Sequence, residues 1–216
     1  MRILVLCDDI WHPAQVVKDG LAGLEKDGFE FDFIADACEW SAKKMAAYSV
    51  VILSKANNVS AADETPWMTT EIEQAFQDYI RAGNGLLVLH SGTAGYEKAT
   101  VLRGLMGGVF REHPEQCAVM ISPAIGALSA QRADTIPAPT DEFSVVDEHY
   151  LMDMDDDHVE VFMTTTSKHG TQPGGWTRTE GDGRVCVLTP GHNLAVWEQP
   201  VYQDLIRQAI DWCANR

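Results

Sequence analysis

The chain has 216 residues, 45% of them hydrophobic, which suits one α/β domain over residues 1–216 with a substantial core. Its 32 acidic residues outnumber 16 basic ones and give a formal net charge of -16, so the average field repels nucleic acid and anionic membrane surfaces. Five scattered cysteines without a CxxC spacing exclude a disulfide scaffold and a zinc ribbon. With no signal peptide and no apolar run long enough to span a bilayer, we predict a cytoplasmic protein whose partner is a neutral small molecule.

The first half of the chain alternates between short apolar runs and amphipathic helical patterns. Continuous apolar runs are typical of buried parallel strands, and apolar residues repeated every three to four positions indicate helices packed against them. Strands are expected at 3–6, 29–34, 50–53 and 85–89, and helices at 11–28, at 41–48 and in a third segment that Thr70 caps and Gly83 ends. This order predicts a doubly wound sheet.

The second half departs from this alternation. A short segment at 102–106 precedes a glycine-containing loop at 107–114, and prolines at 123, 137 and 139 favour an irregular surface insertion. Later come a strand at 159–163, a hairpin-like pair at 173–178 and 184–188, and a closing helix at 200–212. We therefore predict a three-layer αβα sandwich, mostly parallel with antiparallel additions. Neither a dinucleotide glycine fingerprint nor a P-loop occurs, so no nucleotide cofactor is expected.

The apolar run 85–89 ends on His90, Ser91 and Gly92, which is the outline of a nucleophile elbow. In that pattern the nucleophile stands two residues before the second glycine, and His90 occupies this place. Ser91 is at the wrong offset and is better explained as a turn residue. The elbow therefore presents an imidazole at the sheet edge where open α/β sheets bind ligands.

Other histidines and carboxylates follow predicted strands or lie in loops, and we expect their strand ends to converge. His192 follows the strand at 184–188, and His12 follows the first strand; the loops carry His113, Glu148 and His149. We expect His90 and His192 to be the catalytic residues, helped by Glu148 or His149. A capping role at the start of the following helix explains His12 as well as a functional role does. The histidines also leave open a divalent metal site, although the sequence has no HExxH or comparable ligand spacing.

Trp176 and Arg178 add an aromatic plane and a fork of hydrogen-bond donors. Together with His12 and His113 they suit the binding of a sugar ring and its hydroxyls. Packing of Trp176 on the sheet explains the same residue equally well.

The ordered set of motifs resembles the trehalose-utilization (ThuA-like) family over most of the chain. It comprises 85–90, 147–150, 176–178 with 181–185, 190–192 and the closing helix. That family is similar in fold to the class I glutamine amidotransferases, a flavodoxin-like sandwich. The resemblance implies carbohydrate metabolism, with trehalose, related disaccharides or their 3-keto derivatives as substrates.

The chain departs from the amidotransferase pattern at its two central positions. His90 holds the place of the cysteine in Gly-x-Cys-x-Gly, and the Pro-x-Glu expected after the partner histidine, His192, is missing. Without a thiolate there is no acyl-enzyme route from glutamine, so glutamine hydrolysis is disfavoured. Two functions stay open: a sugar-modifying enzyme with histidine acid/base or metal-assisted chemistry, and a non-catalytic sugar-binding or interaction module. Tryptophans near the termini leave room for a homo-oligomer.

Overall fold

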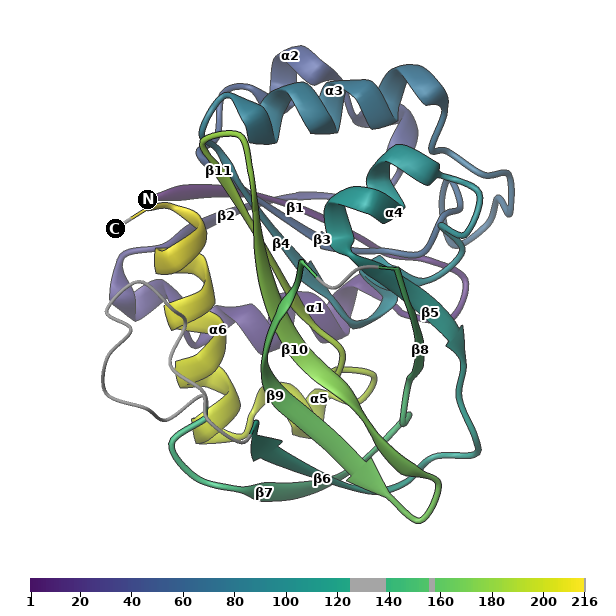
Figure 1. The fold of residues 1–216 in the computed structure, drawn as a ribbon. Helices are drawn as coiled ribbons and strands as arrows, with labels where there is room; N and C mark the ends of the chain where they lie inside the picture. The colour runs from purple at the N-terminus through teal and green to yellow at the C-terminus, as the bar shows by residue number, and fades with distance from the viewer. Residues whose placement is uncertain (125–138, 156–157, 216) are drawn as a thin grey trace.

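The computed structural model describes residues 1–124, 139–155 and 158–215. Its centre is a sheet that, over these residues, has nine strands in the order β2-β1-β3-β4-β11-β10-β9-β6-β7 (Figure 1). The first five strands are mutually parallel: β2 (Glu30–Ile34), β1 (Arg2–Cys7), β3 (Val50–Ser54), β4 (Gly85–Leu89) and β11 (Gly183–Leu188). The start of this order is that of flavodoxin-like sheets, with the chain reversing direction across the sheet at β1.

Four strands extend the sheet beyond β11, and each pairs antiparallel to its neighbour. They are β10 (Gly170–Glu180), β9 (Glu160–Ser167), β6 (Cys117–Pro123) and β7 (Phe143–Asp147). A separate antiparallel pair joins β5 (Gly108–Glu112) to β8 (Leu151–Met154). The predicted αβα class, with a parallel sheet and antiparallel additions, is confirmed.

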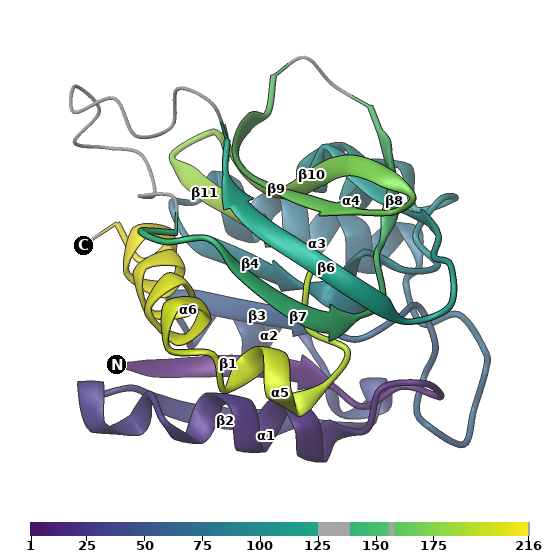
Figure 2. The same cartoon turned by 90° about the horizontal axis from the view of Figure 1, so that it is seen from below.

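Helices cover both faces of the parallel half, as the two views show (Figures 1 and 2). One layer holds α1 (Ala14–Ala22), α5 (Leu194–Trp197) and α6 (Pro200–Cys213), and the other holds α2 (Ala42–Met45), α3 (Thr70–Arg81) and α4 (Thr100–Met106). Short 3-10 turns occupy Glu25–Asp27, Ala37–Glu39 and His90–Thr93. Each layer buries its own apolar cluster against the sheet, which explains why the central strands read as unbroken apolar runs.

Several boundaries differ from the predictions. The helix expected at 11–28 begins only after Pro13 and ends at Ala22, because the residues before Pro13 form a turn that belongs to the site described below. The cap of α3 is Thr69, whose hydroxyl accepts a hydrogen bond from the Ile72 amide, and not Thr70. The loop expected at 107–114 contains β5, whose partner β8 lies about forty residues later. Of the predicted insertion, Pro137 lies outside the described residues.

In the described part of the chain, none of the helices has the length and hydropathy needed to cross a membrane.

Candidate functional site

The turn after β4 has the strained geometry of an elbow, with His90 at its tip. His90 has φ of 44°, in the left-handed region that side chains rarely adopt. A Cβ on Gly92 would lie 2.0 Å from the carbonyl oxygen of Leu53, so only glycine lets this turn pack against β3. His90 is 1% exposed, and its Nδ1 lies 2.8 Å from the Thr189 carbonyl. Because a carbonyl only accepts, Nδ1 carries the proton and Nε2 presents a lone pair.

A buried carboxylate fixes the loop that carries His12. Asp9 Oδ1 accepts hydrogen bonds from the amides of Trp11 and His12, both at 2.9 Å, and from His12 Nδ1 at 2.7 Å. Its Oδ2 accepts from the Ala56 amide at 2.9 Å, which ties the loop after β1 to the end of β3. His12 Nδ1 therefore donates to Asp9, and its Nε2, like that of His90, faces Glu148.

A second buried carboxylate holds Glu148 and His192 together. Asp147, at the end of β7, accepts hydrogen bonds from the amides of Gly191 at 2.8 Å and His192 at 3.0 Å. Strand β7 is the edge of the antiparallel half, whereas His192 follows β11 in the parallel half. Asp147 thus joins two distant parts of the sheet and places Glu148 beside His192.

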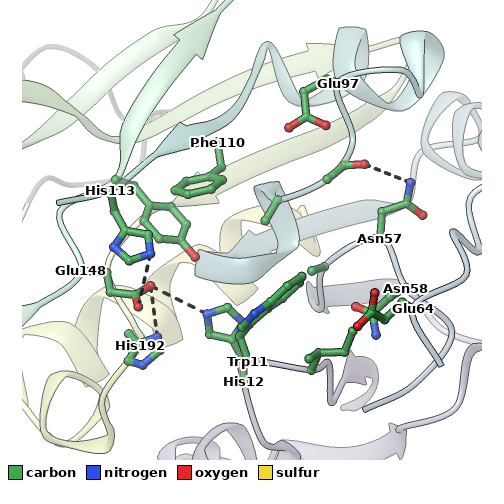
Figure 3. A pocket seen from close by; sticks show the side chains of 15 residues that line it. Trp11, His12, Asn57, Asn58, Glu64, Glu97, Phe110, His113, Glu148 and His192 are labelled. Atoms are coloured by element: carbon green, nitrogen blue, oxygen red, sulfur yellow. Dashed lines mark hydrogen bonds and ion pairs between the residues drawn. The ribbon is translucent and has the colours of Figure 1, made fainter. Parts of the chain in front are cut away.

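These strand ends bring His12, His90, Glu148 and His192 into one cluster, as predicted. Their ligand atoms all lie within 4.8 Å of one another. Glu148 Oε2 is 3.1 Å from His192 Nδ1, 3.5 Å from His90 Nε2 and 3.9 Å from His12 Nε2. Dashed lines in Figure 3 join Glu148 to His192 and to His12. Within the described residues none of these three buried nitrogens has a hydrogen-bond partner.

The charges in the cluster are strongly coupled. Burial alone would lower the pKa of His12, but the hydrogen bond to Asp9 and the nearby Glu148 carboxylate raise it to about 9. Burial opposes ionisation of Glu148 as well, yet His12, His192 and His90 hold its pKa well below the usual range. For His90 burial dominates and lowers the pKa. The cluster is therefore centred on an ionised carboxylate beside imidazoles that differ in their affinity for protons.

Three members of the cluster, His12, Glu148 and His192, line a cavity of about 450 Å³, whereas the buried His90 is not part of its lining. His113 lies at its mouth, 35% exposed at the side chain, with Nε2 3.5 Å from Glu148 Oε1, the oxygen that faces away from the other histidines. Tyr150 lines the wall and stacks on His90 with ring centroids 4.1 Å apart, and Phe110 packs on Tyr150 at 4.3 Å. Of the predicted sugar contacts, His12 and His113 do line the cavity.

Three predicted site residues lie elsewhere. His149 turns away from Glu148: its Nε2 donates to the Thr165 carbonyl and its Nδ1 pairs with the Ser167 hydroxyl, so its side chain is satisfied against β9. Trp176 is fully buried and donates to the Met106 carbonyl, as a core residue does. Arg178 donates to the Gly104 carbonyl and pairs with Glu180. Trp176 and Arg178 do not line the cavity, and His149 does not join the cluster.

The sequence-based choice of site residues omitted several groups that the structure places at the site. Asp9 and Asp147 orient the ligand-bearing loops, and Tyr150 and Trp11 line the cavity. Asp9 had a local signal, since it precedes His12 by three residues directly after an apolar strand. Asp147 had none, because its role depends on a loop 44 residues away in sequence.

The donor set and its surroundings fit a transition-metal ion. Three imidazole nitrogens and a carboxylate are ligands that zinc and related divalent metals accept, and tetrahedral ligands at about 2.0–2.1 Å from a metal lie about 3.4 Å apart. The distances from Glu148 Oε2 to the three nitrogens, 3.1–3.9 Å, bracket that spacing. Asp9 and the Thr189 carbonyl supply the outer hydrogen bonds that ligating histidines commonly make.

Comparisons with known proteins agree on the fold. A protein described as ThuA-like from Parabacteroides merdae superposes with a TM-score of 0.73 at 16% identity, covering 99% of this chain and 90% of its own. Another from Bacteroides uniformis gives 0.72 at 19% identity, covering 99% and 91%. A cytoplasmic protein from Salmonella typhimurium LT2 gives 0.66 at 15% identity, covering 100% and 98%. At such identities these matches show the fold alone.

No curated protein matches the sequence. The family model for ThuA, described as trehalose utilisation, matches residues 5–213. That match takes in the elbow at His90, the cluster and both supporting carboxylates. The chain belongs to the ThuA, or trehalose utilisation, family.

Proposed function

We propose that the chain is a metal-dependent enzyme of carbohydrate metabolism, with a divalent transition metal held by His12, His90, Glu148 and His192. The observation that carries this proposal is the set of three buried imidazole nitrogens that, in the described part of the chain, lack hydrogen-bond partners and face one carboxylate. A buried polar atom without a partner costs about 1–3 kcal/mol. Three such nitrogens facing one carboxylate favour a bound cation as the missing partner, and its binding would release any proton that they carry.

A metal bound there would polarise a carbonyl or hydroxyl oxygen of the sugar and make the adjoining proton easier to remove. The protein's own groups would then hold and move that proton. Glu148 directs Oε2 to the cluster and Oε1 to His113, which reaches solvent at the mouth of the cavity. His113 is thus placed to exchange a proton between the sugar and water as a general acid or base.

The family supports a carbohydrate substrate, and we propose trehalose, related disaccharides or their 3-keto derivatives. The cavity volume lies within the range of about 300–1,000 Å³ that is usual for small-molecule sites. The acidic chain favours neutral over anionic substrates.

The test combines elemental analysis of the purified protein with turnover assays on disaccharides and 3-keto disaccharides. The central variant is His90→Asn, since asparagine tolerates the left-handed backbone at this position better than alanine does. We expect bound metal in the wild type, loss of metal from the variant, and turnover lower by about 10²- to 10⁴-fold. His169→Asn, at an exposed position in the turn after β9, is the matched control and should behave as wild type.

Wild-type protein that takes up no divalent metal would refute the metal centre. Turnover by His90→Asn at the wild-type rate would remove His90 from the mechanism. Tight sugar binding without turnover of any substrate would instead support the non-catalytic sugar-binding module.

A further inference from the structure

Trp11 is a large apolar side chain left in solvent beside the cluster. It is 63% exposed, whereas the other five tryptophans of the chain are buried or half-buried. It lines the same cavity as its neighbour in sequence, His12. Its backbone is held by the amide hydrogen bond to the buried Asp9 carboxylate. The indole therefore stands on a fixed loop without being covered by the protein, a position that suits contact with a ligand.

The rim of the cavity is acidic. Glu64 and Glu97 line it, both exposed, and none of the described residues that line it is Lys or Arg. Lys55 is buried next to this region, but its ammonium group donates to the Asp8 carbonyl and Lys55 does not contribute to the lining. The two glutamates offer acceptors for hydroxyl groups, and the described lining has no Lys or Arg to pair with a phosphate or carboxylate.

Figure 3 shows the cluster residues Glu148 and His192 at one side of the cavity and Glu64 at the other. Trp11 lies between them, next to His12. A ligand whose reacting ring occupies the cluster would thus extend past the indole towards the acidic side.

We infer that the Trp11 side of the cavity is a subsite for a second, uncharged sugar ring, which stacks on the indole while Glu64 and Glu97 select against anionic sugars. This inference rests on the proposed function, because it takes the cluster as the place of the reacting ring. The apolar face of a pyranose ring covers the exposed indole, and its hydroxyls donate to the rim carboxylates. A phosphorylated ring would instead bring its charge close to two carboxylates, with no Lys or Arg in the described lining to offset them.

The experiment measures binding by calorimetry on metal-loaded protein with five probes: glucose, trehalose, maltose, sucrose and trehalose 6-phosphate. We expect at least one neutral disaccharide to bind more tightly than glucose, and trehalose 6-phosphate to bind more weakly than trehalose. Trp11→Ala should weaken disaccharide binding by about 2- to 12-fold, the strength of one aromatic stacking contact, and leave glucose binding unchanged. Trp11→Phe should recover part of the loss. Met120→Ala, which shortens another exposed apolar side chain on β6, is the matched control.

The role of the rim carboxylates is tested with the double variant Glu64→Gln with Glu97→Gln. We expect this variant to reduce the difference in Kd between trehalose and trehalose 6-phosphate. The inference is overturned if Trp11→Ala binds every disaccharide as wild type does, if trehalose 6-phosphate binds the wild type as tightly as trehalose, or if none of the three disaccharides binds.

Metal content and turnover of the same samples separate this inference from the proposed function. Trp11-dependent disaccharide binding in a protein without metal or turnover would support the subsite and refute the enzyme. A metal-loaded, active protein whose KM for disaccharides is unchanged by Trp11→Ala would support the enzyme and refute the subsite.

Discussion

Replacement of Asp9 by asparagine tests whether the metal centre depends on the carboxylate behind it. Asp9 Oδ1 accepts three hydrogen bonds, including that of His12 Nδ1, and Oδ2 accepts one from the Ala56 amide. An asparagine that keeps its oxygen at the Oδ1 place turns its NH₂ group against the Ala56 N–H, so one buried donor loses its partner at about 1–3 kcal/mol. For a chain of this size the corresponding fall in Tm is about 2–12 °C.

The larger expected effect is on metal binding. The negative charge of Asp9 keeps the proton on His12 Nδ1 and makes Nε2 a better electron donor, and loss of such an outer partner typically weakens metal affinity by about 10- to 100-fold. Competition with a chromophoric chelator measures that affinity, and circular dichroism measures Tm. Asp8→Asn is the matched control, because Asp8 is adjacent but its carboxylate accepts from the Ala14 amide at the start of α1. The reasoning is refuted if Asp9→Asn lowers Tm but leaves metal affinity at the wild-type value, or if both variants weaken it equally.

Two further predictions concern the elbow and the thiols. Gly92→Ala should destabilise the protein by about 3 kcal/mol, because its Cβ would meet the backbone of β3. Gly104→Ala, with no atom within 4 Å of the added Cβ, should be neutral or stabilising, and equal Tm values for the two variants would contradict the packing argument. Iodoacetamide at pH 8 should label the exposed Cys38 in the folded protein. It should label Cys7 only after denaturation, because burial shields this thiol and raises its pKa to about 12. Mass spectrometry of native and denatured samples identifies which cysteine is labelled in each.

The fold was predictable because its central strands are buried on both faces. The runs at 50–53 and 85–89 are apolar throughout, and the structure places both strands in the middle of the sheet. Strand β5 had no such pattern: it begins with glycine, ends in charged residues and exists through its pairing with β8. The start of α1 was placed too early: the apolar positions that mark the helix, such as Val16 and Leu21, all follow Pro13, and the residues before Pro13 are held in a turn by Asp9.

The cluster was predictable from its elements and only in part from its residues. All four members follow strands of one sheet in the structure, and strand ends meet at an edge. The sequence placed His12, His90 and His192 after strands, but it placed Glu148 in a loop. The choice between Glu148 and His149 needed the direction of each side chain. Adjacent residues in an extended segment face opposite sides, and the sequence does not say which side is the cavity.

The same limit applied to Trp176 in β10, where an aromatic residue on a strand could face either the ligand or a helix. The structure buries it against the Met106 carbonyl at the end of α4. The exposed aromatic residue is Trp11, which lies in a turn with no strand periodicity to mark it.

An elbow with histidine at its tip presents that side chain as rigidly as an elbow with cysteine presents a thiol. The backbone of His90 adopts φ of 44°, and Gly92 lets the turn pack on β3, so one side chain is presented rigidly at the carboxyl edge of the sheet. A nucleophile needs one partner base beside it, whereas a metal ligand needs several convergent donors. The loops after β1, β7 and β11 supply those donors, and Asp9 and Asp147 hold them in place. The metal-assisted chemistry that we propose therefore draws its ligands from the ends of β1, β4, β7 and β11 and relies on the elbow to hold one of them, His90.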